Sequence, residues 1–225
     1  MSISSNLSQI KNNLPSHVTL VAVSKTKPIS DIMQAYEAGQ RIFGENKVQE
    51  MTEKWEQMPK DIQWHMIGHV QRNKVKYMAP YVTLIHGVDS LRLLKEINKQ
   101  AKKWRRVIPC LLQVYIAKEE TKFGLEQDEL LQLIHSDEFK SFENIKVIGL
   151  MGMASFTEDT DRIKQEFQTL KDIFDYVKPY QLPNCHFEQL SIGMSGDYTI
   201  ALECGSTMVR IGSSIFGARE GAESK

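Results

Sequence analysis

The sequence predicts an α/β protein built as a single (β/α)8 barrel of the TIM type, with one extra helix ahead of the first strand. Eight short apolar runs alternate with longer amphipathic stretches, which is the order of a barrel with a helix after each strand. Several of these runs are almost continuously apolar, as parallel strands buried on both faces are. The length of 225 residues suits one domain over the whole chain.

The predicted elements follow this alternation along the chain. The runs predicted as strands are residues 18–24, 42–45, 64–68, 84–88, 108–115, 146–153, 187–193 and 208–212. The amphipathic stretches predicted as longer helices are residues 29–38, 46–57, 90–104, 128–135 and 159–177. Shorter helices are expected after Gly68 and at residues 197–203, and the extra helix at residues 5–13. An open, doubly wound sheet would show the same alternation, but the count of eight favours closure.

The helix predicted at residues 29–38 has the clearest boundaries. Pro28 stands just before its first turn, where a missing N–H costs nothing, and Gly39 follows its last turn. In residues 159–177 apolar side chains recur every three or four positions, so one face of that helix should pack against the sheet.

The composition is that of an ordinary globular protein without net charge. Lys plus Arg and Asp plus Glu both number 28, which argues against a dedicated nucleic-acid binder. The three cysteines form no C-x-x-C pair, and this suits a reducing cytosol rather than a disulfide framework. The N-terminus is polar, and no stretch approaches the roughly 20 apolar residues of a membrane span. We therefore expect a cytoplasmic protein that contacts neither nucleic acid nor membrane.

Lys25 is the first candidate for a residue that reacts with or binds a ligand. In barrels of this kind the functional residues gather at the C-terminal ends of the strands. Lys25 directly follows the first predicted strand, so its amine should lie at the barrel mouth. The alternative is an ordinary loop lysine whose amine reaches water.

The ends of the second and third strands carry further polar residues. Asn46 follows the second strand as either a helix N-cap or a hydrogen-bonding residue of the site. His65 and His69 are four residues apart, a spacing that suits a metal on a helix. Here His65 falls in a strand and Gly68 interrupts the chain between the two, so we predict no metal site.

Small residues are concentrated near the last two strands. Residues 191–197 read Ser-Ile-Gly-Met-Ser-Gly-Asp, and residues 205–214 contain two glycines and three serines. Barrels often hold a phosphate between the loops after strands seven and eight, where small residues let backbone N–H groups approach its oxygens. Two tight turns are the alternative. We call these two loops the phosphate cup. A ligand that is a phosphorylated aldehyde would place its phosphate in the cup and its aldehyde on Lys25.

Seven segments, in order and over nearly the whole chain, resemble the pyridoxal phosphate homeostasis proteins (the YggS/PROSC/YlmE family). The segments are AVSKTKP at 22–28, FGENKVQE at 43–50, WHMIGHVQRNK at 64–74, KFGL at 122–125, GLMGM at 149–153, LSIGMSGDY at 190–198 and GSTMVRIGSSIFG at 205–217. One mild departure is Ile192, where the family often has Met.

The resemblance implies a barrel similar to the N-terminal domain of alanine racemase and pyridoxal 5'-phosphate (PLP) as cofactor, held as a Schiff base on Lys25. It implies phosphate contacts from Ser191, Ser195, Gly212 and Ser213. It places Arg210 beside the pyridine nitrogen. Three further positions match family residues that line the pocket: Asn46, His65 and Met151. No residue is assigned a catalytic role.

Two functions follow from this site. An arginine beside the ring nitrogen keeps that nitrogen unprotonated and weakens carbanion chemistry. We therefore expect a carrier or reservoir that passes PLP to apo-enzymes. The alternative is a racemase-like enzyme in which Tyr115, Tyr198 or His65 acts as a second acid, and a third interpretation is a barrel for an unrelated phosphorylated metabolite.

Two further expectations concern the lysine and the assembly. Lys27 and Arg210 should lower the pKa of Lys25, since nearby cations disfavour a second positive charge. The resemblance also implies a single PLP-binding barrel domain over residues 1–225 without the C-terminal β-domain of the racemases, so a monomer is expected.

Overall fold

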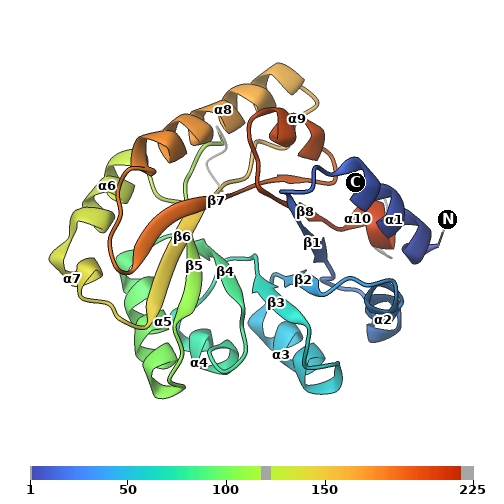
Figure 1. The fold of residues 1–225 in the computed structure, drawn as a ribbon, viewed down its shortest axis with the longest axis horizontal. Helices are drawn as coiled ribbons and strands as arrows, with labels where there is room; N and C mark the ends of the chain where they lie inside the picture. The colour runs from blue at the N-terminus through green and yellow to red at the C-terminus, as the bar shows by residue number, and fades with distance from the viewer. Residues whose placement is uncertain (1, 118–122, 219–225) are drawn as a thin grey trace.

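The computed structural model describes residues 2–117 and 123–218, and these form a closed barrel of parallel strands (Figure 1). The strands are β1 (Thr19–Val23), β2 (Ile42–Glu45), β3 (Gln63–Met66), β4 (Leu84–Val88), β5 (Ile108–Gln113), β6 (Ile145–Met151), β7 (Cys185–Met194) and β8 (Met208–Ile211). They pair in sequence order, and β8 pairs with β1 through Leu20 and Val209 to close the barrel. The prediction of a closed barrel is therefore confirmed, and the open sheet is excluded.

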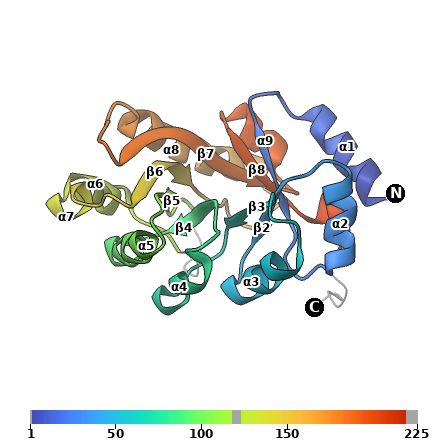
Figure 2. The same ribbon diagram turned by 60° about the horizontal axis from the view of Figure 1, so that its bottom comes forward.

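Helices surround the barrel on the outside. They are α1 (Ile3–Asn13), α2 (Ile29–Glu37), α3 (Val48–Gln57), η1 (Arg72–Lys74), α4 (Val75–Met78), α5 (Leu91–Lys103), α6 (Gln127–His135), α7 (Asp137–Lys140), α8 (Thr160–Val177), α9 (Tyr198–Glu203) and α10 (Ser213–Phe216). The extra helix is α1, which packs beside α2 and α10 in both views (Figures 1 and 2). Within the described ranges, none of these helices has both the length and the apolar composition of a membrane span.

The structure differs from the prediction at a few short elements. Helix α3 begins at Val48 with Lys47 as its N-cap, so Asn46 is not the cap that one interpretation made of it. Helices α7 and α10 were not predicted, because each is four residues long, too short to show a helical period.

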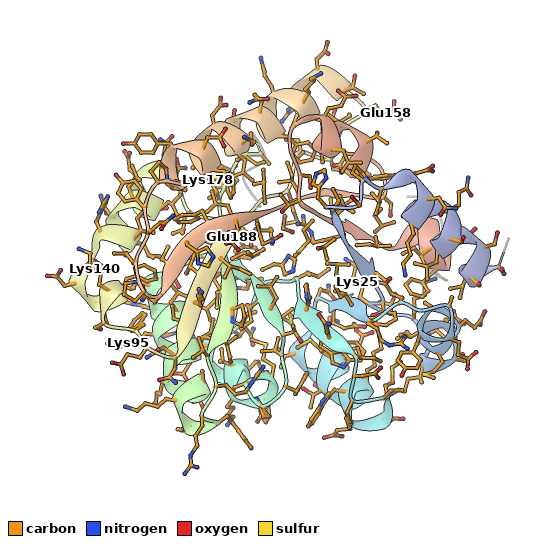
Figure 3. The ribbon with its side chains drawn as sticks, in the orientation of Figure 1. Lys25, Lys95, Lys140, Glu158, Lys178 and Glu188 are labelled. Carbon is orange, nitrogen blue, oxygen red and sulfur yellow. The ribbon has the colours of Figure 1, made fainter. Side chains whose placement is uncertain are left out.

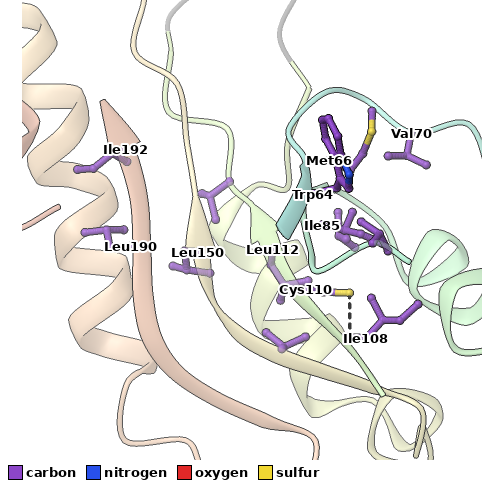
Figure 4. Close-up of a cluster of buried hydrophobic side chains, with 14 of the residues drawn as sticks. Trp64, Met66, Val70, Ile85, Ile108, Cys110, Leu112, Leu150, Leu190 and Ile192 are labelled. Atoms are coloured by element: carbon purple, nitrogen blue, oxygen red, sulfur yellow. Dashed lines mark hydrogen bonds between the residues drawn. The ribbon is translucent and has the colours of Figure 1, made fainter. Parts of the chain in front are cut away.

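Side chains of each strand alternate between two apolar layers. The outer layer lies between strands and helices, and Figure 4 shows part of it around Trp64, Leu112 and Leu150. A second, smaller cluster fills the inside of the barrel: Val21, Leu84, Leu111, Met151 and Met208. Because side chains two residues apart share a face, the residues that follow this inner cluster along the strands point into the barrel nearer its mouth.

Candidate functional site

Lys25 lies two residues after the end of β1, at the mouth of the barrel. Its side chain is partly buried, and Figure 3 places it within the ring of helices, whereas Lys95 and Lys140 project from the outer surface. Lys27 is occupied elsewhere: its Nζ donates to the carbonyl oxygens of Phe216 at 3.1 Å and Ala218 at 2.9 Å. The structure thus brings Lys25 to the mouth and ties Lys27 to the end of α10.

The loops after β7 and β8 meet beside the end of β1. The N–H of Gly212 donates to Oγ of Ser195 over 3.2 Å, which joins the two loops. A Cβ at Gly212 would lie 3.1 Å from the carbonyl oxygen of Val23, so the second loop also touches β1. Ser213 is exposed and begins α10, whose N-terminus has no side-chain cap. Three of the four predicted phosphate residues, Ser195, Gly212 and Ser213, therefore lie together.

Arg210 lies inside the barrel and is almost completely buried. Its Nη1 donates to the backbone oxygen of Ser191 at 2.9 Å and to the Ser191 hydroxyl at 2.5 Å, and Nη2 donates to Gly152 O at 3.0 Å. Burial lowers the pKa of Arg210 to about 10, against the opposing charge of Asp197, so the guanidinium is still a cation at neutral pH. Ser191 is fully buried, so the structure places it in this layer rather than with Ser195.

Two buried histidines continue this polar layer across the barrel. His86 Nδ1 lies 3.0 Å from the Ser191 hydroxyl, and His86 Nε2 lies 2.9 Å from His65 Nδ1. Burial lowers the pKa of His65 to about 3 and that of His86 well below its ordinary value, and both rings are neutral at physiological pH. His86 was not among the predicted site residues, although a histidine inside the apolar run of β4 is a signal visible in the sequence.

The other predicted pocket residues lie at different depths. Met151 belongs to the inner apolar cluster and is fully buried. Asn46 is partly buried, and its backbone packs tightly on Gly68, where a Cβ would lie 2.4 Å from Asn46 O.

His65 and His69 do not share a partner. His65 contacts His86, whereas His69 Nδ1 lies 3.4 Å from Asp89 Oδ2. Among the residues that the structure describes, no cluster of three or more His, Cys, Asp or Glu could hold a metal ion.

A buried ion pair under the Lys25 turn was also missed. Lys54 Nζ lies 2.7 Å from Glu45 Oε1, which also accepts a hydrogen bond of 2.6 Å from the Ser24 hydroxyl. Burial raises the pKa of Glu45 to about 7, even though the Lys54 ammonium and the Ser24 hydroxyl both favour its charged form. The sequence carries no sign of this pair, because Lys54 looks like any lysine on an amphipathic helix.

Comparison with known proteins identifies the family of the barrel. The family model described as alanine racemase, N-terminal domain, matches residues 1–220. A pyridoxal phosphate homeostasis protein of Pasteurella multocida is 37% identical over 98% of this chain and 99% of its own length. One from Haemophilus influenzae is 39% identical over 93% of this chain and 88% of its own length.

Solved structures agree with this similarity. PipY of Synechococcus elongatus, solved with PLP bound, aligns with a TM-score of 0.87 and 31% identity over 96% of this chain and all of its own. Alanine racemase of Bartonella henselae shares only the fold, with a TM-score of 0.70 and 16% identity over 98% of this chain and 60% of its own. The chain therefore belongs to the alanine racemase N-terminal domain family and, within that fold, to the pyridoxal phosphate homeostasis proteins.

Proposed function

We propose that this protein binds PLP covalently through Lys25 and serves PLP homeostasis as a carrier or reservoir, without efficient catalysis. The observation that carries the proposal is the meeting of three strand ends. The Gly212 N–H and the Ser195 hydroxyl join the loops after β7 and β8 beside the end of β1, which leads into Lys25. The PLP-bound structure of PipY supports the same cofactor for a chain of this similarity.

The donors around the mouth fit such a cofactor. Ser195, Gly212 and Ser213 supply hydroxyl and backbone N–H groups of the kind that bind phosphate oxygens. Of the five N–H groups of Arg210, three donate to Ser191 and Gly152. In the described part of the chain the other two have no acceptor, and they suit a ring nitrogen with a lone pair. We assign Asn46, His65 and Met151 to the walls of the pocket and Ser191 to the support of Arg210.

Lys25 and Arg210 have separate proposed roles toward the cofactor. Lys25 would supply the neutral amine for condensation with the aldehyde of PLP, which would form a C=N bond with release of one water molecule and would be reversed by hydrolysis. Arg210 is cationic at neutral pH and would keep a proton off a ring nitrogen bound beside it. An unprotonated ring is a weak electron sink, so this arrangement favours holding the cofactor over transforming an amino acid.

A racemase-like enzyme is the alternative, and it needs a second acid. His65 does not fill that role as an imidazolium, since burial holds its pKa at about 3. Tyr115 and Tyr198 remain as candidates. Incubating the PLP-loaded protein with alanine in deuterated water separates the two functions. A carrier leaves the α-proton in place, whereas exchange of that proton, followed by NMR, would favour the enzyme.

The cofactor link is tested by reduction and mass spectrometry. The protein is incubated with PLP and reduced with borohydride, and the modified peptide is mapped. We expect a phosphopyridoxyl mass on Lys25 and none on Lys27, the neighbouring lysine that is bonded to α10. If Lys25 stays unmodified in excess PLP, the proposal is wrong and the phosphate cup needs another ligand.

We further propose that this protein is a monomeric, cytoplasmic carrier. It would pass PLP to the apo forms of PLP-dependent enzymes. All three cysteines are free and buried, which suits a reducing compartment. Mixing the loaded protein with an apo-enzyme in the presence of a PLP-trapping phosphatase tests direct transfer. Activation that survives the phosphatase supports hand-over, and activation that disappears with it indicates release into solution.

A further inference from the structure

The turn that carries Lys25 has an unfavourable backbone conformation. Thr26 has φ of 64°, and in the described residues only Arg105 is another non-glycine with positive φ. A left-handed conformation costs a residue with a Cβ roughly 1–2 kcal/mol. Such a conformation persists only where the surrounding contacts hold it.

Contacts on both sides of Lys25 hold this turn. On one side, the carbonyl oxygen of Ser24 accepts from Lys54 Nζ at 2.8 Å. On the other, the N–H of Thr26 donates to Glu50 Oε1 at 2.6 Å. Lys25 itself is therefore flanked by two backbone groups that are both held by side chains of α3.

Lys54 is the centre of these contacts. Its ammonium donates to Ser24 O at 2.8 Å, to Glu45 Oε1 at 2.7 Å and to Glu50 Oε1 at 2.7 Å. An ammonium has three protons, so every donor is used. Although burial raises the pKa of Glu50, the hydrogen bonds from Lys54 and from the Thr26 N–H leave it below its ordinary value, so this carboxylate is charged at neutral pH.

Because the charged groups of Lys54 and Glu45 are buried, their attraction alone adds little to the stability of the fold. Lys54 is 6% exposed and Glu45 is not exposed at all. Glu45 Oε2 is buried and, among the described residues, has no hydrogen-bond partner. Desolvating such charges commonly cancels their attraction, so an apolar residue could hold α3 against β2 equally well. A hydrocarbon side chain could not fix the Ser24 carbonyl.

We propose that Lys54 is a positioning residue for Lys25, which with Glu45 and Glu50 clamps residues 24–26 so that the Lys25 amine is held ready for the cofactor aldehyde. The inference rests on the proposed attachment of PLP to Lys25. It assigns a function to three residues of β2 and α3 that do not themselves touch the cofactor.

The test compares two ligands on the variant Lys54→Met, which keeps the length and apolar stem of the side chain. Pyridoxamine 5'-phosphate shares the ring and phosphate but has no aldehyde, so it reports on the pocket alone. PLP also reports on the lysine, through the rate at which the visible absorbance of the covalent link appears. We expect this rate to fall roughly 10- to 100-fold, because displacing a reacting group by about 1 Å has such an effect. We expect the affinity for pyridoxamine 5'-phosphate to stay within about threefold, since the loops after β7 and β8 are unchanged.

Matched variants separate positioning from general loosening. Lys95→Met removes an exposed lysine that pairs with Glu138, and it should leave both readouts unchanged. Glu50→Ala removes the acceptor of the Thr26 N–H and should slow attachment, whereas Glu53→Ala, an exposed position on the same helix, should not. Adding Thr26→Gly to Glu50→Ala should restore much of the rate, because glycine adopts positive φ without the clamp.

The outcomes are distinct. If the wild type forms no link at Lys25, both the proposed function and this inference are wrong. If the wild type does so and Lys54→Met and Glu50→Ala react as fast, only the positioning role is wrong. Parallel losses of rate and of pyridoxamine 5'-phosphate affinity would also overturn it, since they indicate a loosened pocket. If Lys54→Met does not fold, Glu50→Ala with and without Thr26→Gly decides the question.

Discussion

Four polar side chains form a continuous chain of hydrogen bonds across the inside of the barrel. They run from His65 through His86 and Ser191 to Arg210, and each is at most 3% exposed. Buried polar groups are tolerated when each has a partner and are costly when one partner is lost. His86, in the middle, has a partner on each side and no contact with solvent.

Replacing His86 should therefore destabilise the barrel. His86→Leu leaves His65 Nδ1 without its partner and the Ser191 hydroxyl with Arg210 alone, at a cost of about 1–3 kcal/mol in the free energy of unfolding. Urea unfolding measures this change. The control is His69→Leu, which removes a ring that is 41% exposed, lies 3.4 Å from Asp89 Oδ2 and stacks on Phe123, and which should cost less than His86→Leu because its polar atoms can be solvated. Equal costs for the two variants would contradict the role given to the buried chain.

Glu45 should make stability depend on pH in a defined direction. Its pKa is about 7 in the folded protein, above the value of 4.5 expected when unfolded. Between these values the folded state binds more protons, so the contribution of Glu45 is fully present below pH 4.5 and declines as the pH rises through 7.

The matched comparison is wild type against Glu45→Gln, which cannot ionise. The difference in their free energy of unfolding should fall by up to about 3 kcal/mol between roughly pH 5 and pH 8. A difference for Glu45→Gln that stays flat or rises with pH would mean that its carboxyl is charged in the fold at all these pH values.

At the scale of elements, strand spacing decides where side chains fit. Gly149 on β6 faces the backbone of β7, and a Cβ there would lie 1.8 Å from the carbonyl oxygen of Gln189. A backbone atom cannot move aside as a flexible side chain does. The position coincides with an irregularity in the β6–β7 register between Val147 and Gly149.

Gly149→Ala should consequently push β6 and β7 apart. We expect a loss of about 1–3 kcal/mol or more in the free energy of unfolding, as for other overpacked sites. Gly196→Ala serves as the control, because no atom lies within 4 Å of its added Cβ and its φ is not positive. Thermal and urea unfolding of the two variants check the difference. A Gly149→Ala protein as stable as the control would show that the strands can separate without cost.

At the scale of the molecule, one apolar layer connects the first helix to the last. The outer cluster extends from Leu7 in α1 to Phe216 in α10, and Asn6 Nδ2 donates to Ile215 O over 3.1 Å between these two helices. Closure of the barrel also joins β1 to β8. Segments from the two ends of the chain therefore depend on each other for burial.

We predict that the chain unfolds as one domain in a single transition. Trp64 is fully buried in the outer layer, so the tryptophan fluorescence of the chain, to which Trp55 and Trp104 also contribute, changes when this packing is lost, while circular dichroism reports on the helices. The two curves in urea should coincide, as they do for cooperative single domains. Separate midpoints would indicate that part of the barrel unfolds independently and would contradict a single domain.

Local patterns along the chain were enough to predict the eight strands, most of the helices and the loops where Lys25, Ser195, Gly212 and Ser213 lie. These follow from local signals, since hydrophobic periods, Gly and Pro positions and strand order are all written along the chain. The roles proposed for the site residues are still predictions. The partners of Arg210 and Lys54 were decided only by the tertiary structure. Arg210 meets Ser191 and the buried histidines because closure and register bring inward-facing side chains of distant strands to one level. Lys54 meets Glu45 and the turn at Lys25 because α3 packs against the outside of β2. No local period in the sequence encodes which residues will meet in either place.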